Sequence, residues 1–344
     1  MREKGIAALA IVVIIIVAVA AVGAGVYLFI GKQAGPSGGP QGGSPNENQP
    51  PENHPSENQP PENVPPTNVG LNFTADSGLR VSGGSVPCIV KLPSGTYRLF
   101  YNSGADICSA SSTDGLTFTV DSGKRVTKGS VTDPDKDSAG NPVLIQFGAN
   151  SFVLFYEGKS GNTHVMLSAT STDGLSFTKQ SGIRYSGTTA DGGIVSAFDI
   201  AKEPDKLRLY YIGDWSGKNN IRTATSTDGG NTWTFEQGNI CGDDNAGGGP
   251  NSFVDPDIVK LPSGGYKLYV KKGADKIYSF SSTDGLHFTQ DSDVRLQASQ
   301  FASLGVTELL DPDTLVFADN SMRMFCGGFG GSGPVGIVSA SATS

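Results

Sequence analysis

The stretch STDGLSFTKQSGIRYSG, residues 171–187, decides the fold, because close copies of it recur along the chain. Three further copies begin at Ser112, Ser226 and Ser282. The aspartates that the four copies share follow one another at separations of 59, 55 and 56 residues: Asp114, Asp173, Asp228 and Asp284. A period of this size indicates a repeat architecture.

A fifth copy is divided between the two ends of this region. GLNFTADSGLRVSGG occupies residues 70–84, and the chain stops at SASATS, residues 339–344, where another STDG turn would follow. A ring of repeats is closed most stably when its last unit mixes strands from both ends, because closure removes two exposed sheet edges. The divided copy therefore predicts a closed ring.

Each repeat contains four short runs with the alternation that is typical of strands. An apolar run comes first, an aromatic-rich run such as TYRLFY or GYKLYV follows, and the third run ends in the STDG turn. Four antiparallel strands make one propeller blade. Five runs are suited to the innermost strands: 86–92, 141–147, 197–202, 255–261 and 311–317. We predict an all-β, five-bladed β-propeller over residues 69–344, in which 71–81 adds the outer strand to the blade built from 315–341.

The preceding residues are of a different kind. Residues 6–30 are uncharged and mostly apolar, and as a helix they would span roughly 37 Å, enough to cross a membrane. Arg2 and Lys4 favour a cytoplasmic end at residues 1–5 and a cell-surface, extracellular remainder. Residues 31–68 are rich in Gly, Pro and Asn and predict a semi-rigid linker. The membrane is thus an expected partner, through a single-pass anchor.

A second interpretation of the N-terminus comes from the sequence REKG. It resembles the processing site of archaeal pilin-like signals, with cleavage after Gly5. On that interpretation the chain is a subunit of a surface filament.

Composition excludes some functions. The net charge of −8 and the acidic isoelectric point argue against nucleic acid as a partner. The four cysteines permit three pairings, but Cys88 and Cys108 fall two strands apart in one blade, farther than a disulfide reaches. We expect free thiols. Asn72-Phe73-Thr74 is the only N-glycosylation sequon.

The STDG turns resemble the Asp-box repeat. STDGGNTW, residues 226–233, fits the pattern S-x-D-x-G-x-x-W, and the other copies are one residue shorter and end in Phe. In such a hairpin the hydroxyl and the carboxylate bond local backbone N–H groups, and the aromatic ring packs between sheets. We expect the four turn aspartates to be structural.

Function is expected on the opposite face. There the loops that enter each inner strand, and the loops between strands 2 and 3, are long, variable and acidic. Asp191 and Trp215 lie in such loops and are candidate ligand-binding residues, Trp215 because an indole can stack on a sugar.

Two inner strands begin with Asp-Pro pairs, in VDPDIVKLPSGGYKLYV and LDPDTLVFADNSMRMF. With these pairs the chain resembles the five-bladed glycosidases of the arabinanase, xylosidase and fructosidase kind, whose catalytic carboxylates surround the tunnel mouth. The resemblance implies Asp255 as general base, Asp311 as a carboxylate that orients the sugar or tunes a pKa, and Glu308 as proton donor. The next acidic residues, Asp257 and Asp313, would contact the ligand.

The chain also departs from that family. In that family the general base opens the first blade, where this sequence has Val86. Asn141 and Ser196 stand at the corresponding places in the next two blades. The preferred prediction is therefore a carbohydrate-binding surface protein without catalysis, and an exported glycoside hydrolase is the alternative.

A calcium site is a further candidate. DPDKDSAGN, residues 133–141, places Asp133, Asp135 and Asp137 at alternate positions before a glycine. This arrangement resembles oxygen-rich calcium loops, although the glutamate of an EF-hand is missing. A solvated acidic loop is the alternative.

Overall fold

The computed structural model describes residues 72–189, 193–213, 221–238, 240–241 and 253–343. The predicted membrane helix, the linker, Asp191 and Trp215 lie outside these residues. Among the described residues no helix has the length and apolar character needed to cross a membrane.

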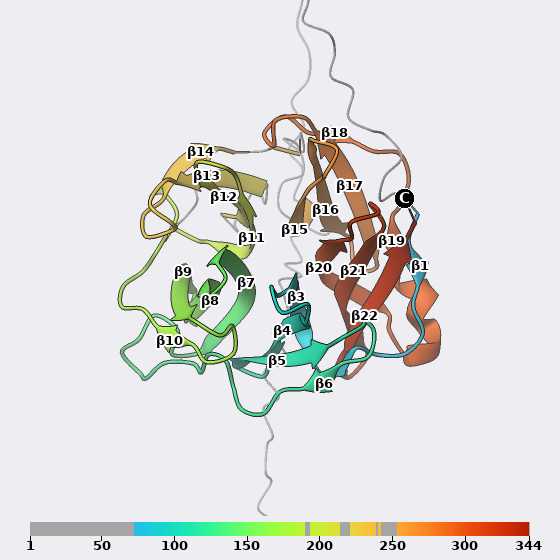
Figure 1. The fold of residues 1–344 in the computed structure, drawn as a ribbon, viewed down its shortest axis with the longest axis horizontal. Helices are drawn as coiled ribbons and strands as arrows, with labels where there is room; N and C mark the ends of the chain where they lie inside the picture. Colours follow the sequence, from blue (N-terminus) through green and yellow to red (C-terminus); the bar gives the residue numbers. More distant parts are fainter. Residues whose placement is uncertain (1–71, 190–192, 214–220, 239, 242–252, 344) are drawn as a thin grey trace, which may run out of the picture.

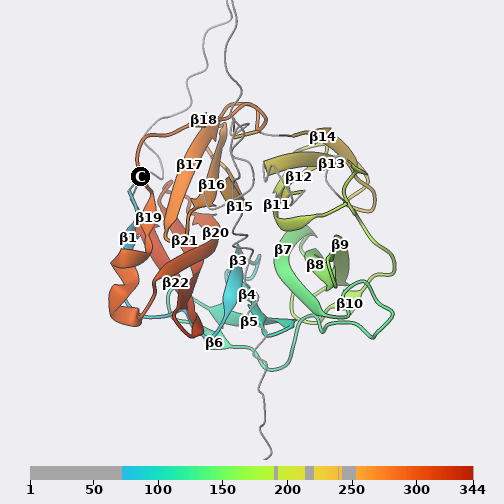
Figure 2. The same cartoon turned by 180° about the vertical axis from the view of Figure 1, so that it is seen from behind.

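The chain forms five antiparallel sheets around a common axis, and the innermost strands β3, β7, β11, β15 and β20 surround the centre (Figures 1 and 2). The fold is therefore the five-bladed β-propeller that the repeats predict. Blade 1 contains β3 (Ser85–Lys91), β4 (Tyr97–Ser103), β5 (Asp106–Ser112) and β6 (Thr119–Val120). Blade 2 contains β7 (Ser138–Gly148), β8 (Ser151–Ser160), β9 (Thr163–Ser171) and β10 (Thr178–Lys179).

The remaining blades repeat the pattern. Blade 3 contains β11 (Ser196–Lys202), β12 (Leu207–Ile212), β13 (Ile221–Ser226) and β14 (Thr234–Gln237). Blade 4 contains β15 (Phe253–Lys260), β16 (Tyr266–Lys272), β17 (Lys276–Ser282), β18 (Thr289–Gln290) and the short β19 (Leu296–Gln297), which leads into a 3-10 helical segment, Ala298–Leu304. Blade 5 contains β20 (Glu308–Val316), β21 (Met322–Gly330) and β22 (Gly333–Ala342).

Two short strands from the N-terminal side complete blade 5. β1 (Thr74–Ala75) pairs with β22 through Thr74 and Ser341, and β2 (Val81–Ser82) pairs with the same strand. Phe73 and Val338 belong to one buried cluster, which confirms that residues from both ends of the propeller close the ring.

The core consists of five apolar clusters, one between each pair of neighbouring blades. The cluster between blades 1 and 2 contains Phe100 and Leu154, both fully buried. Every blade contributes to two clusters, so the loss of one blade would expose apolar surface on both of its neighbours. All four cysteines are free, and Cys108 is only half-buried.

Candidate functional site

The inner strands carry the same irregularity in every blade, close to where each strand begins. The ladder between strands 1 and 2 is interrupted there by a bulge in all five sheets. One bulge residue in each blade has a positive φ, between 42° and 55°: Val86, Asn141, Ala197, Asp255 and Asp311. Such bulges redirect side chains, and they concentrate at functional sites. We call the opening formed by these five residues the tunnel mouth.

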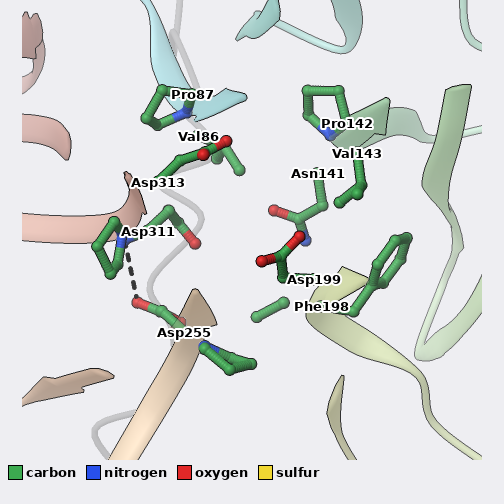
Figure 3. A pocket seen from close by; sticks show the side chains of 13 residues that line it. Val86, Pro87, Asn141, Pro142, Val143, Phe198, Asp199, Asp255, Asp311 and Asp313 are labelled. Carbon is green, nitrogen blue, oxygen red and sulfur yellow. Dashed lines mark hydrogen bonds between the residues drawn. The ribbon is translucent and has the colours of Figure 1, made fainter. Parts of the chain in front are cut away.

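The tunnel mouth has an apolar side and an acidic side. Blades 1 and 3 contribute Val86 and Ala197, whereas blades 4 and 5 contribute the half-buried carboxyl groups of Asp255 and Asp311. The two residues are in contact, since the Asp311 backbone N–H donates to Asp255 Oδ2 at 3.4 Å (Figure 3). The structure thus brings together two of the three residues that the resemblance names as catalytic.

Burial raises the pKa of Asp255 despite the nearby Lys271 ammonium group. Burial and then the neighbouring Asp255 raise the pKa of Asp311 well above its ordinary range. Two carboxyl groups this close and this enclosed favour their neutral forms. The acidic side of the mouth therefore presents carboxyl groups that can donate hydrogen bonds.

Glu308, the third predicted catalytic residue, lies at the first position of β20. Its Oε1 accepts from Lys271 Nζ at 3.1 Å, and its side chain is 39% exposed. The glutamate is close enough to raise the pKa of both aspartates. Its charge is already balanced by a buried lysine.

Sequence reasoning missed Glu157, on β8. This buried side chain accepts from Ser196 Oγ at 2.8 Å and from the Ala197 N–H at 3.2 Å, and it also bonds Asn141 Nδ2. Glu157 Oε1 lies 2.5 Å from Nδ1 of His164. It therefore fixes two of the five mouth residues, Asn141 and Ala197, across the junction of blades 2 and 3.

The pKa of Glu157 is shifted in the opposite direction to those of Asp255 and Asp311. Burial alone would raise the pKa of this carboxyl, but the bond to His164, together with those from Ser196 and the Ala197 N–H, lowers it below the ordinary value. The pKa of Glu157 is thus lowered, whereas those of Asp255 and Asp311 are raised. The four bonding partners of Glu157 leave little of it available to a ligand.

The signal for Glu157 was present in the repeats. The same position of the second strand is occupied by Asn102 in blade 1, Glu157 in blade 2 and Lys271 in blade 4. Each of these residues pairs with the residue that flanks the bulge of its inner strand. Polar side chains at that place interrupt otherwise apolar second strands. Aligning the blades by register would have singled them out.

Below the mouth a second set of side chains ties neighbouring blades together. Asp199 Oδ2 accepts from the Ile258 N–H of blade 4 at 2.8 Å, and its Oδ1 accepts from the Ile200 N–H. Asp313 Oδ2 accepts from the Ile89 N–H of blade 1 at 3.0 Å. At the equivalent place in blade 1, Cys88 Sγ accepts from the Leu144 N–H of blade 2.

Two of the three predicted ligand-binding aspartates, Asp257 and Asp313, belong to this lower set. Asp257 is 2% exposed, and the pKa of Asp257 is raised well above its ordinary value by burial and then by Asp313. Asp313 is bonded to a backbone N–H, as above. The geometry gives both residues contacts within the tunnel wall, beneath the mouth.

The cavity between the inner strands is small, about 30 Å³, and mouth residues line it together with Asp199 and Asp313 (Figure 3). A space of this size holds about two water molecules. No sugar ring fits inside, so a ligand of that size would bind across the mouth.

The predicted calcium ligands each bond to a different protein partner. Asp133 Oδ2 accepts from the Ser130 N–H, Asp137 Oδ2 accepts from the Gly161 N–H, and Asp135 pairs with Lys179 at 2.5 Å. Within the residues that the structure describes, no group of three metal-ligating side chains converges.

The STDG turns lie at the far ends of the third strands, on the face opposite the mouth. In the first, Asp114 Oδ1 accepts from Ser112 Oγ, from the Leu116 N–H and from the Thr117 N–H, each at 2.8 Å. Asp173, Asp284 and Asp228 hold their turns in the same way. Four such bonds lower the pKa of Asp228 to about 2. These carboxylates accept hydrogen bonds from donors within their own turns.

No protein-family profile and no curated protein sequence matches the chain. Solved structures do. A thermostable family-43 glycoside hydrolase is 14% identical with a TM-score of 0.59, over 78% of this chain and 91% of the other. A family-117 glycoside hydrolase from the marine bacterium Zobellia galactanivorans is 13% identical with a TM-score of 0.58, over 80% and 91%. A structure from the GH130 family is 14% identical with a TM-score of 0.56, over 82% and 92%. The chain shares its five-bladed fold with these glycoside hydrolases.

Proposed function

We propose that the propeller binds a neutral carbohydrate across the tunnel mouth and does not cleave it. The observation that carries the proposal is the adjacent pair Asp255 and Asp311, whose carboxyl groups are half-buried and favour the neutral form. Neutral carboxyls donate and accept hydrogen bonds, as sugar hydroxyls require. The apolar side of the mouth, with Val86 and Ala197, suits the apolar face of a sugar ring.

The contacts of the glutamates near the mouth argue against hydrolysis. Glycoside hydrolysis needs one protonated carboxyl and one ionised carboxylate on opposite sides of the scissile bond. Two further carboxyl groups lie near the mouth. Glu157 is held by four bonding partners, and Glu308 is paired with Lys271. Neither is free to attack or to activate water.

A glycoside hydrolase is the second candidate, favoured by the solved structures that share the fold. In that case Asp311, with its strongly raised pKa, would donate the proton in place of Glu308. Glu308 would have to leave Lys271 to act as base in place of Asp255. A glycan array followed by product analysis on the bound glycans separates the two functions. Binding without released sugar supports the first, and turnover that is abolished by Asp311→Asn supports the second.

We further propose display at the cell surface, with residues 6–30 as membrane anchor and 31–68 as spacer. The apolar length of the first segment and the proline content of the second support this arrangement. Mass spectrometry of the mature N-terminus tests the filament alternative, because processing after Gly5 would remove Met1 and Arg2. Running the array with calcium and with a chelator tests the predicted role of Asp133, Asp135 and Asp137.

A further inference from the structure

The same three-residue arrangement leads into the outer strand of every blade, and its third residue is the first of the strand. An exposed residue is followed by an aromatic ring packed against the neighbouring blade and then by an exposed threonine. The five copies are Thr117-Phe118-Thr119, Ser176-Phe177-Thr178, Thr232-Trp233-Thr234, His287-Phe288-Thr289 and Asn72-Phe73-Thr74. The threonine of a sequon is therefore present in all five blades, but the asparagine two positions before it is present only in blade 5.

In four blades the first residue of this arrangement is clamped. Its backbone N–H donates to the turn carboxylate, at 2.8 Å for Thr117 on Asp114, 2.7 Å for Ser176 on Asp173 and 2.9 Å for His287 on Asp284. Thr232 donates to Asp228 at 3.0 Å. Each of these residues is therefore part of a tight hydrogen-bonded turn.

Asn72 differs because the fifth turn is divided. The residue that aligns with the turn aspartate is Ser344, at the other end of the chain, and Val69-Gly70-Leu71 precedes Asn72 instead. No turn aspartate precedes Asn72 within its own segment. Asn72 is exposed, whereas Phe73 is anchored by its edge-to-face contact with Tyr269, at 5.7 Å between ring centroids.

The surroundings of Asn72 are open. It lines a groove of about 350 Å³ with Arg295, Gln297, Ser299 and Gln300, and Gln300 Nε2 donates to the Phe73 carbonyl at 3.3 Å. Asn72 lies two residues before the closing strand β1, which is next to the C-terminal end of the propeller (Figure 1). Polar walls of this kind accommodate a hydrated saccharide without loss of packing.

We propose that Asn72 is an N-glycosylation site. In the reaction, Asn72 Nδ2 forms a bond to the anomeric carbon of an oligosaccharide, and the bond from that carbon to the phosphate of a lipid-linked donor breaks. The lipid phosphate leaves with the bonding electron pair, and one amide proton is released. The modification requires export, as proposed above, but it does not require ligand binding at the mouth.

The test uses the full chain, isolated from cells that produce it and in which other exported proteins carry N-linked glycans. Mass spectrometry of the peptide that contains Asn72 should show an added glycan. The added mass should be lost in Asn72→Gln and in Thr74→Ala, and retained in Thr74→Ser. An unmodified Asn72 would overturn the proposal.

Thr117→Asn provides a matched control. It creates the sequon Asn-Phe-Thr in blade 1, at the equivalent exposed position but within an intact turn. We expect the new sequon to remain unmodified in most molecules while Asn72 of the same chain is modified. Equal modification at both positions would overturn the argument from the divided turn. Glycan-array binding is measured separately, so its failure leaves this result unaffected.

Discussion

Replacing Asp199 with alanine tests the bonds that tie the inner strands together. The carboxylate accepts from the Ile258 N–H at 2.8 Å and from the Ile200 N–H at 2.7 Å, and both isoleucines are buried. An unsatisfied buried N–H costs about 1–3 kcal/mol. Removal of the carboxyl enlarges the adjacent cavity, and water there can satisfy one of the two groups. We therefore expect a loss of about 2–3 kcal/mol of folding free energy when the carboxyl is neutral.

The loss should depend on pH. Burial raises the pKa of Asp199 from 3.8 to about 6. A group whose pKa is raised in the folded state favours folding below its unfolded pKa, and this contribution is lost as pH rises through the folded pKa. Between pH 4 and pH 7 the wild-type carboxyl should therefore destabilise the fold by up to about 3 kcal/mol. Asp199→Ala removes this penalty, so the two effects should nearly cancel at pH 7.

Urea unfolding of the propeller, residues 69–344, measures the difference. The expected result is a clear decrease in unfolding free energy for Asp199→Ala at pH 4 and little difference from wild type at pH 7. Asp205→Ala, at an exposed position of the β11–β12 turn, is the matched control and should be neutral at both pH values. An equal loss at both pH values would refute the raised pKa, and no loss at pH 4 would refute the role of the two bonds.

Three further outcomes are expected. Asp228→Ala should lower the free energy of unfolding by about 1–2 kcal/mol, as the loss of an exposed helix cap does, and should lower Tm by a few degrees for a domain of this size. Glycan binding should be unchanged, and lost binding at an unaltered Tm would contradict this prediction. Deleting residues 72–82 removes Phe73 and both closing strands, so circular dichroism should show no cooperative melting. A soluble product that melts cooperatively would disprove the idea that the propeller needs these strands to close its ring. Lys267→Met should lower the unfolding free energy by about 3–5 kcal/mol, because Lys267 is fully buried and lies 2.9 Å from Asp291. Adding Asp291→Asn should recover part of this loss, and calorimetry that finds no recovery would count against the ion pair.

The repeats were sufficient to predict the fold. Blade number, the order of the strands and closure from both ends all follow from copies of one pattern, and the inner strands begin within three residues of the expected positions. Phe73 could be placed because it aligns with the aromatic residue of every other copy. Repetition made the prediction reliable, since each blade repeats the evidence of the others.

The geometry of the tunnel mouth was harder to predict. Asp255 and Asp257 are two residues apart, and strand alternation alone would place both side chains on one face of the sheet. The bulge between them changes this, because an extra residue redirects the side chains that follow. Asp255 therefore reaches the mouth, while Asp257 is buried in the wall.

Glu157 was missed for a related reason. A single glutamate at the end of an apolar run resembles the usual solvated end of a strand, and its role depends on His164, Ser196 and Ala197, which come from two other strands. Such contacts between blades are determined by packing. They cannot be read from one stretch of sequence.

The position of the divided turn affects how the molecule can be handled and combined with other domains. Thr74 pairs with Ser341, so the first and last described residues of the propeller leave it side by side, on the face opposite the mouth. A fluorescent protein or an affinity tag joined after the last strand, β22, would stand next to the start of β1 and leave the acidic opening accessible. By the same geometry, the whole ring can be inserted into a surface loop of a host protein with little strain at the junctions.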